Sequence, residues 1–210
     1  GWQRMDRILP ILLDELNAVG VPDSDMRIVF ALGTHRAMTE EEMVEAVGEA
    51  VAKRVKMYNP DCRDESQMQY FGTTSRGTKV GFSKLVTEVD HIICTGGIVH
   101  HFFSGYGGGR KALMPGVAAY ETIRHNHSMM FDPNAVIGRL EGNPVYHDQV
   151  ECTEMCRPSF LINVVLDEEK RFLEVFAGDY VEAHKEACKM VDKVYGAAVT
   201  QEAALVLATC

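Results

Sequence analysis

Two short runs of β-branched and aromatic residues, each followed by glycine, constrain most strongly how this chain can fold. The first is MRIVFALG at residues 26–33, with its apolar stretch from Ile28 to Leu32, and the second is DHIICTGGIV at residues 90–99. Continuous apolar runs of this length are typical of strands buried on both faces of a parallel sheet. In such sheets the ligand-binding residues follow the carboxyl ends of the strands.

Segments with helical periodicity alternate with these strands. Thr39 and the three glutamates after it resemble a capping box, which predicts a helix running to about Met57. Other segments with this periodicity predict helices at 5–18, 118–131, 143–156 and 179–196, and a short helix beginning at 83 or 84. The alternation predicts an α/β fold with a mostly parallel sheet flanked by helices.

Two turn-rich segments interrupt the alternation, and the chain ends on an apolar stretch. Residues 68–82 contain Gly77 between two short runs and predict a hairpin, and residues 160–178 predict a β-hairpin near the C-terminal part. The apolar tail, residues 197–210, ends abruptly, as if a further element followed it.

The composition excludes two classes of partner. The formal charge is −9 over 210 residues, whereas a nucleic-acid-binding surface is expected to be basic. No apolar run reaches the roughly 18 to 20 residues that span a bilayer, so we expect no membrane partner. Six scattered cysteines without a CxxC pair indicate reduced thiols and a cytoplasmic protein.

Histidines follow both predicted strands. His35 lies in ALGTHRAM, directly after the first strand, and His100 and His101 lie in GGIVHH after the second. Histidine is the usual acid or base near neutral pH, because its unperturbed pKa is about 6.5. If the chain is extended at 100–101, the two adjacent rings point to opposite sides, so only one of them faces a given site.

The second histidine pair is followed by a glycine-rich loop, GYGGGRK, from Gly105 to Lys111. The three consecutive glycines, Gly107, Gly108 and Gly109, resemble an anion-binding loop. The segment lacks the Ser or Thr that follows the lysine of a nucleotide-binding P-loop, which disfavours a kinase or NTPase. Lys111 is a candidate point charge or nucleophilic amine.

A third histidine group, RHNH, lies on the helix predicted at 118–131. His125 and His127 are two residues apart and do not share a helical face, so the pattern predicts at most one of them as a metal ligand. His91, His147 and His184 carry no pattern of their own and are interpreted as ordinary surface or helix histidines. Together these residues suit proton transfer beside a bound anionic or nucleotide-like cofactor, with a transition metal that accepts imidazole.

The motifs GTHR, HHFFSGYGGGRKALMPG and RHNH resemble the N-terminal domain of the lactate racemase family, whose enzymes depend on a nickel pincer nucleotide. The order of the reactive residues carries the resemblance: 66 positions separate His35 from His101, 10 separate His101 from Lys111, and 16 separate Lys111 from His127. The resemblance extends over nearly the whole chain.

The resemblance implies a role for each of these residues. Lys111 would be tethered through a thioamide to the pyridinium nucleotide, with Gly107, Gly108 and Gly109 giving the cofactor room, and His127 would be the protein ligand to nickel. His35 and His101 would be the two acid/base groups on opposite faces of a 2-hydroxy acid substrate. The implied reaction is racemisation or epimerisation by reversible hydride transfer, with cofactor-maturation proteins as partners.

Two features of the family have no counterpart in the sequence. The family carries an Asp-x-Thr-Arg type motif upstream of the first helix and a C-terminal lid domain. We therefore expect residues 1–210 to be the single catalytic N-terminal domain of a larger two-domain protein, and the fragment alone to be inactive. Two alternatives remain open on the residues alone: a metal-dependent hydrolase that uses the histidines around zinc, and a non-catalytic nucleotide-binding module.

Overall fold

The computed structural model describes residues 3–197. The helices α1 to α7 are Met5–Ala18, Glu40–Val47, Glu49–Ala52, Lys84–Thr87, Tyr120–Ser128, Pro144–Cys156 and Glu182–Tyr195. The strands β1 to β9 are Arg27–Val29, Lys56–Tyr58, Met68–Thr73, Lys79–Ser83, Ile93–Gly97, His100–His101, Gly105–Tyr106, Phe160–Leu166 and Phe172–Gly178. Short 3₁₀ helices η1 to η4 cover Asp23–Asp25, Glu65–Gln67, Gly109–Ala112 and Met129–Phe131.

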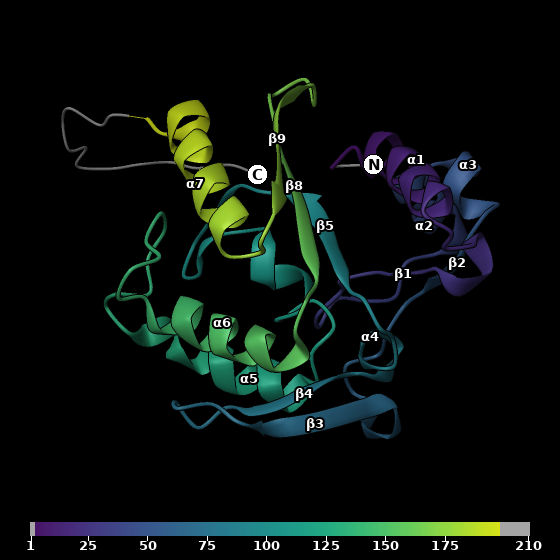
Figure 1. Cartoon of the computed structure of the whole chain (residues 1–210). Helices are drawn as coiled ribbons and strands as arrows, with labels where there is room; N and C mark the ends of the chain where they lie inside the picture. The colour runs from purple at the N-terminus through teal and green to yellow at the C-terminus, as the bar shows by residue number, and fades with distance from the viewer. Residues whose placement is uncertain (1–2, 198–210) are drawn as a thin grey trace.

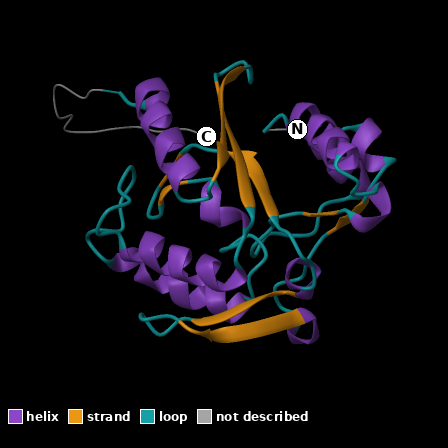
Figure 2. Cartoon of the chain, in the orientation of Figure 1, coloured by secondary structure: helices purple, strands orange, loops and turns teal. Residues whose placement is uncertain are grey.

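A three-stranded sheet, in the order β5-β8-β9, lies at the centre of the molecule (Figures 1 and 2). β5 and β8 are parallel and β8 and β9 are antiparallel, so the β-hairpin predicted near the C-terminal part is confirmed. Helix α7 packs on β8 and β9, and Leu161, Val164 and Val165 of β8 are fully buried. The α/β class is therefore confirmed. The most apolar strand of the central sheet is its middle strand, β8.

The strands do not form one mostly parallel sheet. Among residues 3–197 they divide into four small sheets, with parallel pairing only between β1 and β2 and between β5 and β8. β1 and β2 are three residues each and lie beside α1, α2 and α3, where Leu13, Val47 and Val51 form a separate apolar cluster. The first predicted strand thus belongs to its own small layer rather than to the central sheet.

The helix predicted from Thr39 to about Met57 begins as expected but ends early. Thr39 forms the full capping box with Glu42, which confirms the start of α2. Gly48 at φ 87° then separates α2 from the one-turn α3. A side chain at this position would lie 3.4 Å from Asp6 of α1, so the break coincides with a close approach of α1.

Most of the remaining predicted elements are confirmed. Residues 5–18 form α1, residues 143–156 contain α6, and β3 and β4 form the hairpin predicted over 68–82. None of the helices within residues 3–197 combines the length and the apolar run needed to cross a bilayer. The apolar tail, apart from Ala197, lies outside the described residues.

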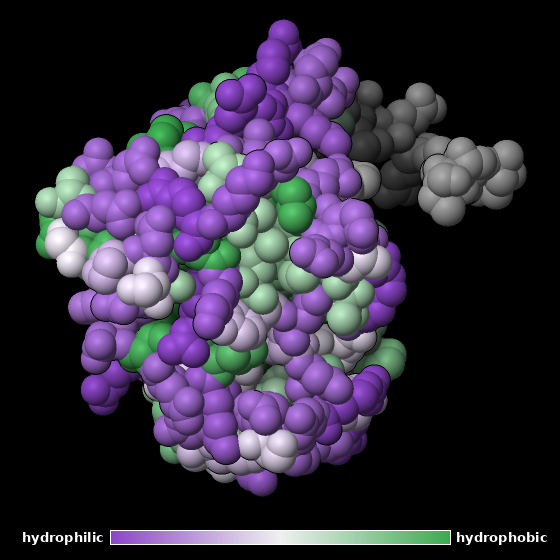
Figure 3. Space-filling view, turned by 90° about the vertical axis from the view of Figure 1, so that its right-hand side faces the viewer, coloured by the Kyte–Doolittle hydropathy of each residue, from purple (hydrophilic) through white to green (hydrophobic). Residues whose placement is uncertain are grey.

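The side of the molecule that carries α1, α2 and α3 is mostly hydrophilic, with hydrophobic side chains in a strip through its middle (Figure 3). A hollow of about 660 Å³ lies between α1 and α2 and is lined mainly by four glutamates, Glu40, Glu41, Glu45 and Glu49. None of the histidines that follow the strands lines this hollow. His100 and His101 lie instead in β6, which follows β5 in the chain.

Candidate active site

The segment after β5 forms a small hairpin and a 3₁₀ helix. β6 pairs with β7, joining His100 to Tyr106 and His101 to Gly105, and η3 follows with Lys111 in its middle. The ring of His100 packs on that of Tyr106, and its Nε2 lies 2.9 Å from a carboxylate oxygen of Asp192 on α7. The contacts of His100 thus differ from those of His101, as the extended backbone predicted.

The rings of His101 and His127 both pack against one aromatic ring, that of Phe103. The centroid of the Phe103 ring lies 4.7 Å from that of His101 and 5.1 Å from that of His127, both in edge-to-face geometry. The two histidines come from β6 and α5 and are 26 residues apart in the chain. Folding therefore brings both histidines against Phe103.

Burial and neighbouring cations keep His101 neutral. Loss of water around the half-buried ring lowers the pKa of His101 to about 4, and the charges of Lys111, Arg110 and His127 act in the same direction. The backbone N–H of Ser104 donates to Nδ1 of His101 at 3.3 Å. The proton of the neutral ring is therefore assigned to Nε2.

Lys111 lies beside these rings with a largely buried amine. Burial lowers the pKa of Lys111 to about 7, and the adjacent guanidinium of Arg110 contributes. Within residues 3–197 its Nζ forms no hydrogen bond and no ion pair. An amine with this pKa is partly neutral at pH 7, and a neutral amine is a nucleophile.

His127 has a buried nitrogen without a partner. Its Nδ1 is out of contact with solvent and forms no hydrogen bond with the described part of the chain. Burial lowers the pKa of His127, and the Lys111 charge adds to the effect. A neutral imidazole with a buried, unsatisfied nitrogen is an available ligand for a metal or a cofactor.

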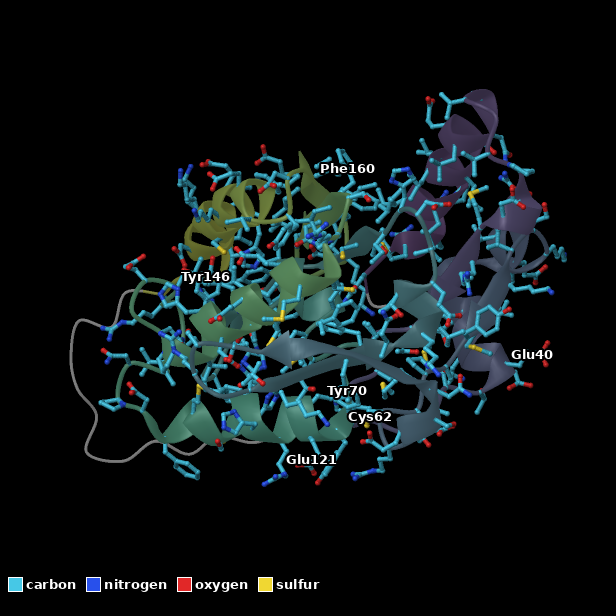
Figure 4. The ribbon with its side chains drawn as sticks, turned by 60° about the horizontal axis from the view of Figure 1, so that its bottom comes forward. Glu40, Cys62, Tyr70, Glu121, Tyr146 and Phe160 are labelled. Atoms are coloured by element: carbon cyan, nitrogen blue, oxygen red, sulfur yellow. The ribbon has the colours of Figure 1, made fainter. Side chains whose placement is uncertain are left out.

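His125 lies on the other side of α5 from His127. Its Nδ1 is 2.8 Å from the hydroxyl of Thr78, and its ring lines a separate hollow of about 400 Å³ together with Tyr70 and Glu121, which Figure 4 labels. The prediction that His125 and His127 do not share a face is therefore confirmed.

His35 is attached to the site through its loop and not through its side chain. The N–H of Gly33 donates to the carbonyl of Gly116 at 2.8 Å, which joins the GTHR loop to the end of the segment that carries Lys111. The ring of His35 is exposed and forms no hydrogen bond within residues 3–197. The described side chains thus bring together His101, Lys111 and His127, with His35 on an adjoining loop.

The glycine loop is packed tightly against the protein itself. Gly108 and Gly109 have φ values of 68° and 57°, and a side chain at these positions would lie 2.6 Å from Asn163 and 2.5 Å from His184, respectively. The N–H groups of Gly107 and Gly109 donate to the Val99 carbonyl and the Asn163 side chain. Two of the three N–H groups that a phosphate loop would present are therefore already used.

Replacing Gly109 with alanine is expected to destabilise the protein by about 2–5 kcal/mol, because left-handed backbone costs about 1–2 and overpacking about 1–3. The control is Gly20→Ala, which has φ 95° but no atom within 4 Å of the added methyl group. It is expected to lose only the backbone part, about 1–2 kcal/mol. Denaturant unfolding of both variants measures the difference, and equal losses would contradict the packing argument.

Arg110 points into the core. Its guanidinium is 2% exposed, lies over the ring of Tyr146 (labelled in Figure 4), and donates to the carbonyl of Ser104 at 2.8 Å and to the side chain of Gln149 at 3.2 Å. Burial lowers the pKa of Arg110 to about 10. Arg110 therefore anchors the loop from within and is not available to contact a bound anion.

His184 also supports the loop. It lies on a helix, as the sequence predicted, but it is a buried support and not an ordinary helix histidine. It is 1% exposed, and its Nε2 lies 2.8 Å from the carbonyl of Gly107. The helical spacing contains the signal, because His184 shares a face of α7 with the buried Ala187, Cys188 and Val191.

As the pH falls, the free energy of unfolding is expected to decrease more steeply in the wild-type protein than in the His184→Gln variant. Burial, assisted by the Arg110 charge, lowers the pKa of His184 to about 3, against about 6.5 in the unfolded chain. Between these values the unfolded state binds one more proton, so stability falls as the pH drops from 6.5 towards 3, by about 1.4 kcal/mol per pH unit. In His184→Gln this contribution is absent, and the unfolding free energy at pH 7, 6 and 5 measures it. Parallel pH profiles for the two proteins would refute the argument.

The histidines do not form a metal site from protein ligands alone. Among residues 3–197, no group of three or more histidine, cysteine or acidic side chains is arranged to hold a metal ion. The zinc hydrolase alternative needs His35, His101 and His127 around one metal, and the structure gives it no support. The five cysteines in this part of the chain are free thiols.

The sequence of the chain is similar to that of known proteins. Residues 2–138 match the family model of the lactate racemase N-terminal domain. Over 189 residues the chain is 40% identical to a lactate racemase of Lactiplantibacillus plantarum, covering 89% of the chain and 44% of that protein. It is 34% identical, over 188 residues, to a lactate racemase of Thermoanaerobacterium thermosaccharolyticum.

Solved structures agree with the sequence matches. The lactate racemase apoprotein of T. thermosaccharolyticum superposes with a TM-score of 0.87 at 33% identity, over 92% of this chain and 46% of the other. A Thermotoga maritima protein at 22% identity has a TM-score of 0.76 and shares the fold. The chain belongs to the lactate racemase family and spans less than half the length of these curated relatives.

Proposed function

We propose that the chain is the catalytic N-terminal domain of a racemase or epimerase of 2-hydroxy acids. The observation that carries the proposal is that His101 and His127 pack on Phe103 with Lys111 close enough for its charge to act on both rings, in a chain of the lactate racemase family. All three side chains are neutral or partly neutral near pH 7, because burial lowers each pKa. The site therefore offers a base, a nucleophilic amine and an imidazole ligand.

The side chains fit a nickel pincer nucleotide. Lys111 would hold it covalently through its amine, and His127 would ligate the metal; its buried Nδ1 without a partner supports this assignment. Gly107, Gly108 and Gly109 would border the group. When bound, the nucleotide supplies the acceptor for the C2 hydride of the substrate.

In the proposed reaction, His101 and His35 move the hydroxyl proton of the substrate. Two groups on different elements suit this task, since the two enantiomers present their hydroxyls differently, and His101 and His35 come from different loops. His101 is neutral at pH 7 but carries its hydrogen on Nε2. To accept a proton at Nε2 it must first place its hydrogen on Nδ1, which breaks the contact from the Ser104 N–H. We therefore expect this ring to adjust when substrate binds.

The proposal includes the surroundings of the enzyme. The substrate is a small 2-hydroxy acid such as lactate, the cofactor-maturation proteins are the partners, and the cytoplasm is the compartment. The acidic character of the chain supports the expectation that it has no nucleic-acid partner. The free cysteines of the described residues support a reducing environment.

Racemisation by the full-length protein tests the proposal. The protein is produced together with the cofactor-making enzymes, and single enantiomers of lactate and of longer 2-hydroxy acids are incubated with it. Loss of optical activity with at least one acid, dependent on nickel during production, is the expected result. A nickel-loaded protein that racemises none of them would contradict the proposal.

A further inference from the structure

One buried amide on α6 contacts the neighbours of all three converging side chains. Gln149 is fully buried, and its Oε1 accepts from the hydroxyl of Ser104 at 2.7 Å and from Nε of Arg110 at 3.2 Å. Its Nε2 donates to Oδ1 of Asn126 at 3.3 Å. These three partners are themselves buried and come from three separate segments of the chain.

Each partner of Gln149 is directly connected to one residue of the candidate site. Ser104 donates its backbone N–H to the ring of His101. The other two are sequence neighbours of the site residues: Arg110 precedes Lys111 in η3, and Asn126 precedes His127 in α5. We propose that Gln149 is a positioning residue, whose single amide group holds these three segments in one relative arrangement. The inference rests on the proposed function, since it concerns the same site.

The chemistry of the position requires an amide. Two donors converge on its oxygen and one acceptor faces its nitrogen, and only glutamine presents both functions at this length. A carboxylate would keep the acceptor and lose the donor. An apolar side chain would leave Arg110, Ser104 and Asn126 each with one unmade hydrogen bond in a buried region, which favours local rearrangement.

Asn126 extends the network to a buried carboxylate. Its Nδ2 donates to Oδ2 of Asp148 at 2.8 Å, and the same carboxylate accepts from the hydroxyls of Thr74 and Thr78. Asn126 is therefore held from both ends, by Asp148 on one side and by Gln149 on the other. Release of the Gln149 end frees α5 to move relative to η3.

The test uses the full-length protein with Gln149→Met, which keeps the length of the side chain and removes both polar functions. The matched control is Cys152→Ala on the same helix, a fully buried residue that lies in the apolar core and has no hydrogen bond to the site. In the loaded enzyme, Gln149→Met is expected to lower kcat by about 10- to 100-fold, with a smaller change in KM. Cys152→Ala is expected to lower the melting temperature and leave kcat unchanged.

A second readout needs neither cofactor nor substrate. Nitrogen-15 NMR of the unloaded protein reports the tautomer of each histidine ring, and Gln149→Met is expected to change the signals of His101 and His127 while Cys152→Ala preserves them. Gln149→Glu, which keeps the acceptor, is expected to change the His127 signals and preserve the His101 tautomer. If Gln149→Met does not fold, the signals of Gln149→Glu decide whether Gln149 positions the site residues.

Two results would overturn the inference: unchanged histidine signals in both Gln149 variants, or an equal fall in kcat in Cys152→Ala. If the wild-type protein racemises no 2-hydroxy acid, the proposed function fails, whereas the NMR comparison still decides the role of Gln149.

Discussion

Replacing Lys111 with arginine in the full-length, cofactor-matured protein is expected to abolish racemisation, by at least about 10⁴-fold, the scale on which loss of one member of a catalytic unit acts. Arginine keeps the charge and nearly the length of the side chain. Its guanidinium stays protonated, however, whereas burial brings the pKa of the Lys111 amine to about 7. The variant therefore removes the nucleophile and retains the cation.

The control for this experiment is Lys189→Arg. Lys189 is exposed on α7 and pairs with Glu186, so the same substitution there is expected to leave turnover unchanged. Nickel retained by the purified protein provides a second readout, and it should fall together with turnover in Lys111→Arg. A Lys111→Arg protein that still racemises would show that the lysine amine is not needed.

Removing the ring nitrogens of His101 is expected to lower turnover by about 10²- to 10⁴-fold, the usual contribution of a positioned acid or base. His101→Phe is the sharpest form of this change, because an aromatic ring can still pack on Phe103. His35→Ala is expected to have an effect of the same order. Neither change is expected to cost much stability, since His35 is exposed and the His101 ring keeps its packing.

The adjacent His100 supplies the matched control. It lies in the same two-residue strand, but its ring contacts Tyr106 and Asp192. His100→Gln is therefore expected to retain nearly full turnover. Steady-state rates for the three variants with each enantiomer check the assignment, and equal losses at positions 100 and 101 would contradict it.

Local sequence signals predicted the elements well and their grouping less well. The capping box at Thr39, the helix at 5–18 and the C-terminal hairpin depend on residues close in the chain, and all three are confirmed. The division of the strands into small sheets depends on which apolar faces meet in space. No local pattern contains that information. The break of the helix at Gly48 differs, because it lies at a glycine with a left-handed φ of 87°, a residue type visible in the sequence.

Motif and spacing singled out His101, Lys111 and His127, which the structure brings together. The ring of His35, in contrast, lies exposed on an adjoining loop. The roles of all four residues stay predictions.

The residues that support the site are less visible in the sequence. The helical spacing places His184 on the apolar face of α7, but it does not show what the ring contacts. Gln149 lies on a helix whose polar residues resemble a solvated face, and only the folded chain shows that it is buried. Arg110 is adjacent to Lys111 in the sequence, but its guanidinium is bound by buried groups of the core. Burial of polar groups is decided by long-range contacts.

The mass of the peptide that contains Lys111, taken from the matured full-length protein, tests the central claim most directly. The claim is that the converging side chains form a site where this lysine carries the cofactor. The account predicts a mass increment on Lys111 that is absent when the cofactor-making enzymes are left out. An active racemase whose Lys111 peptide has its unmodified mass would contradict the account.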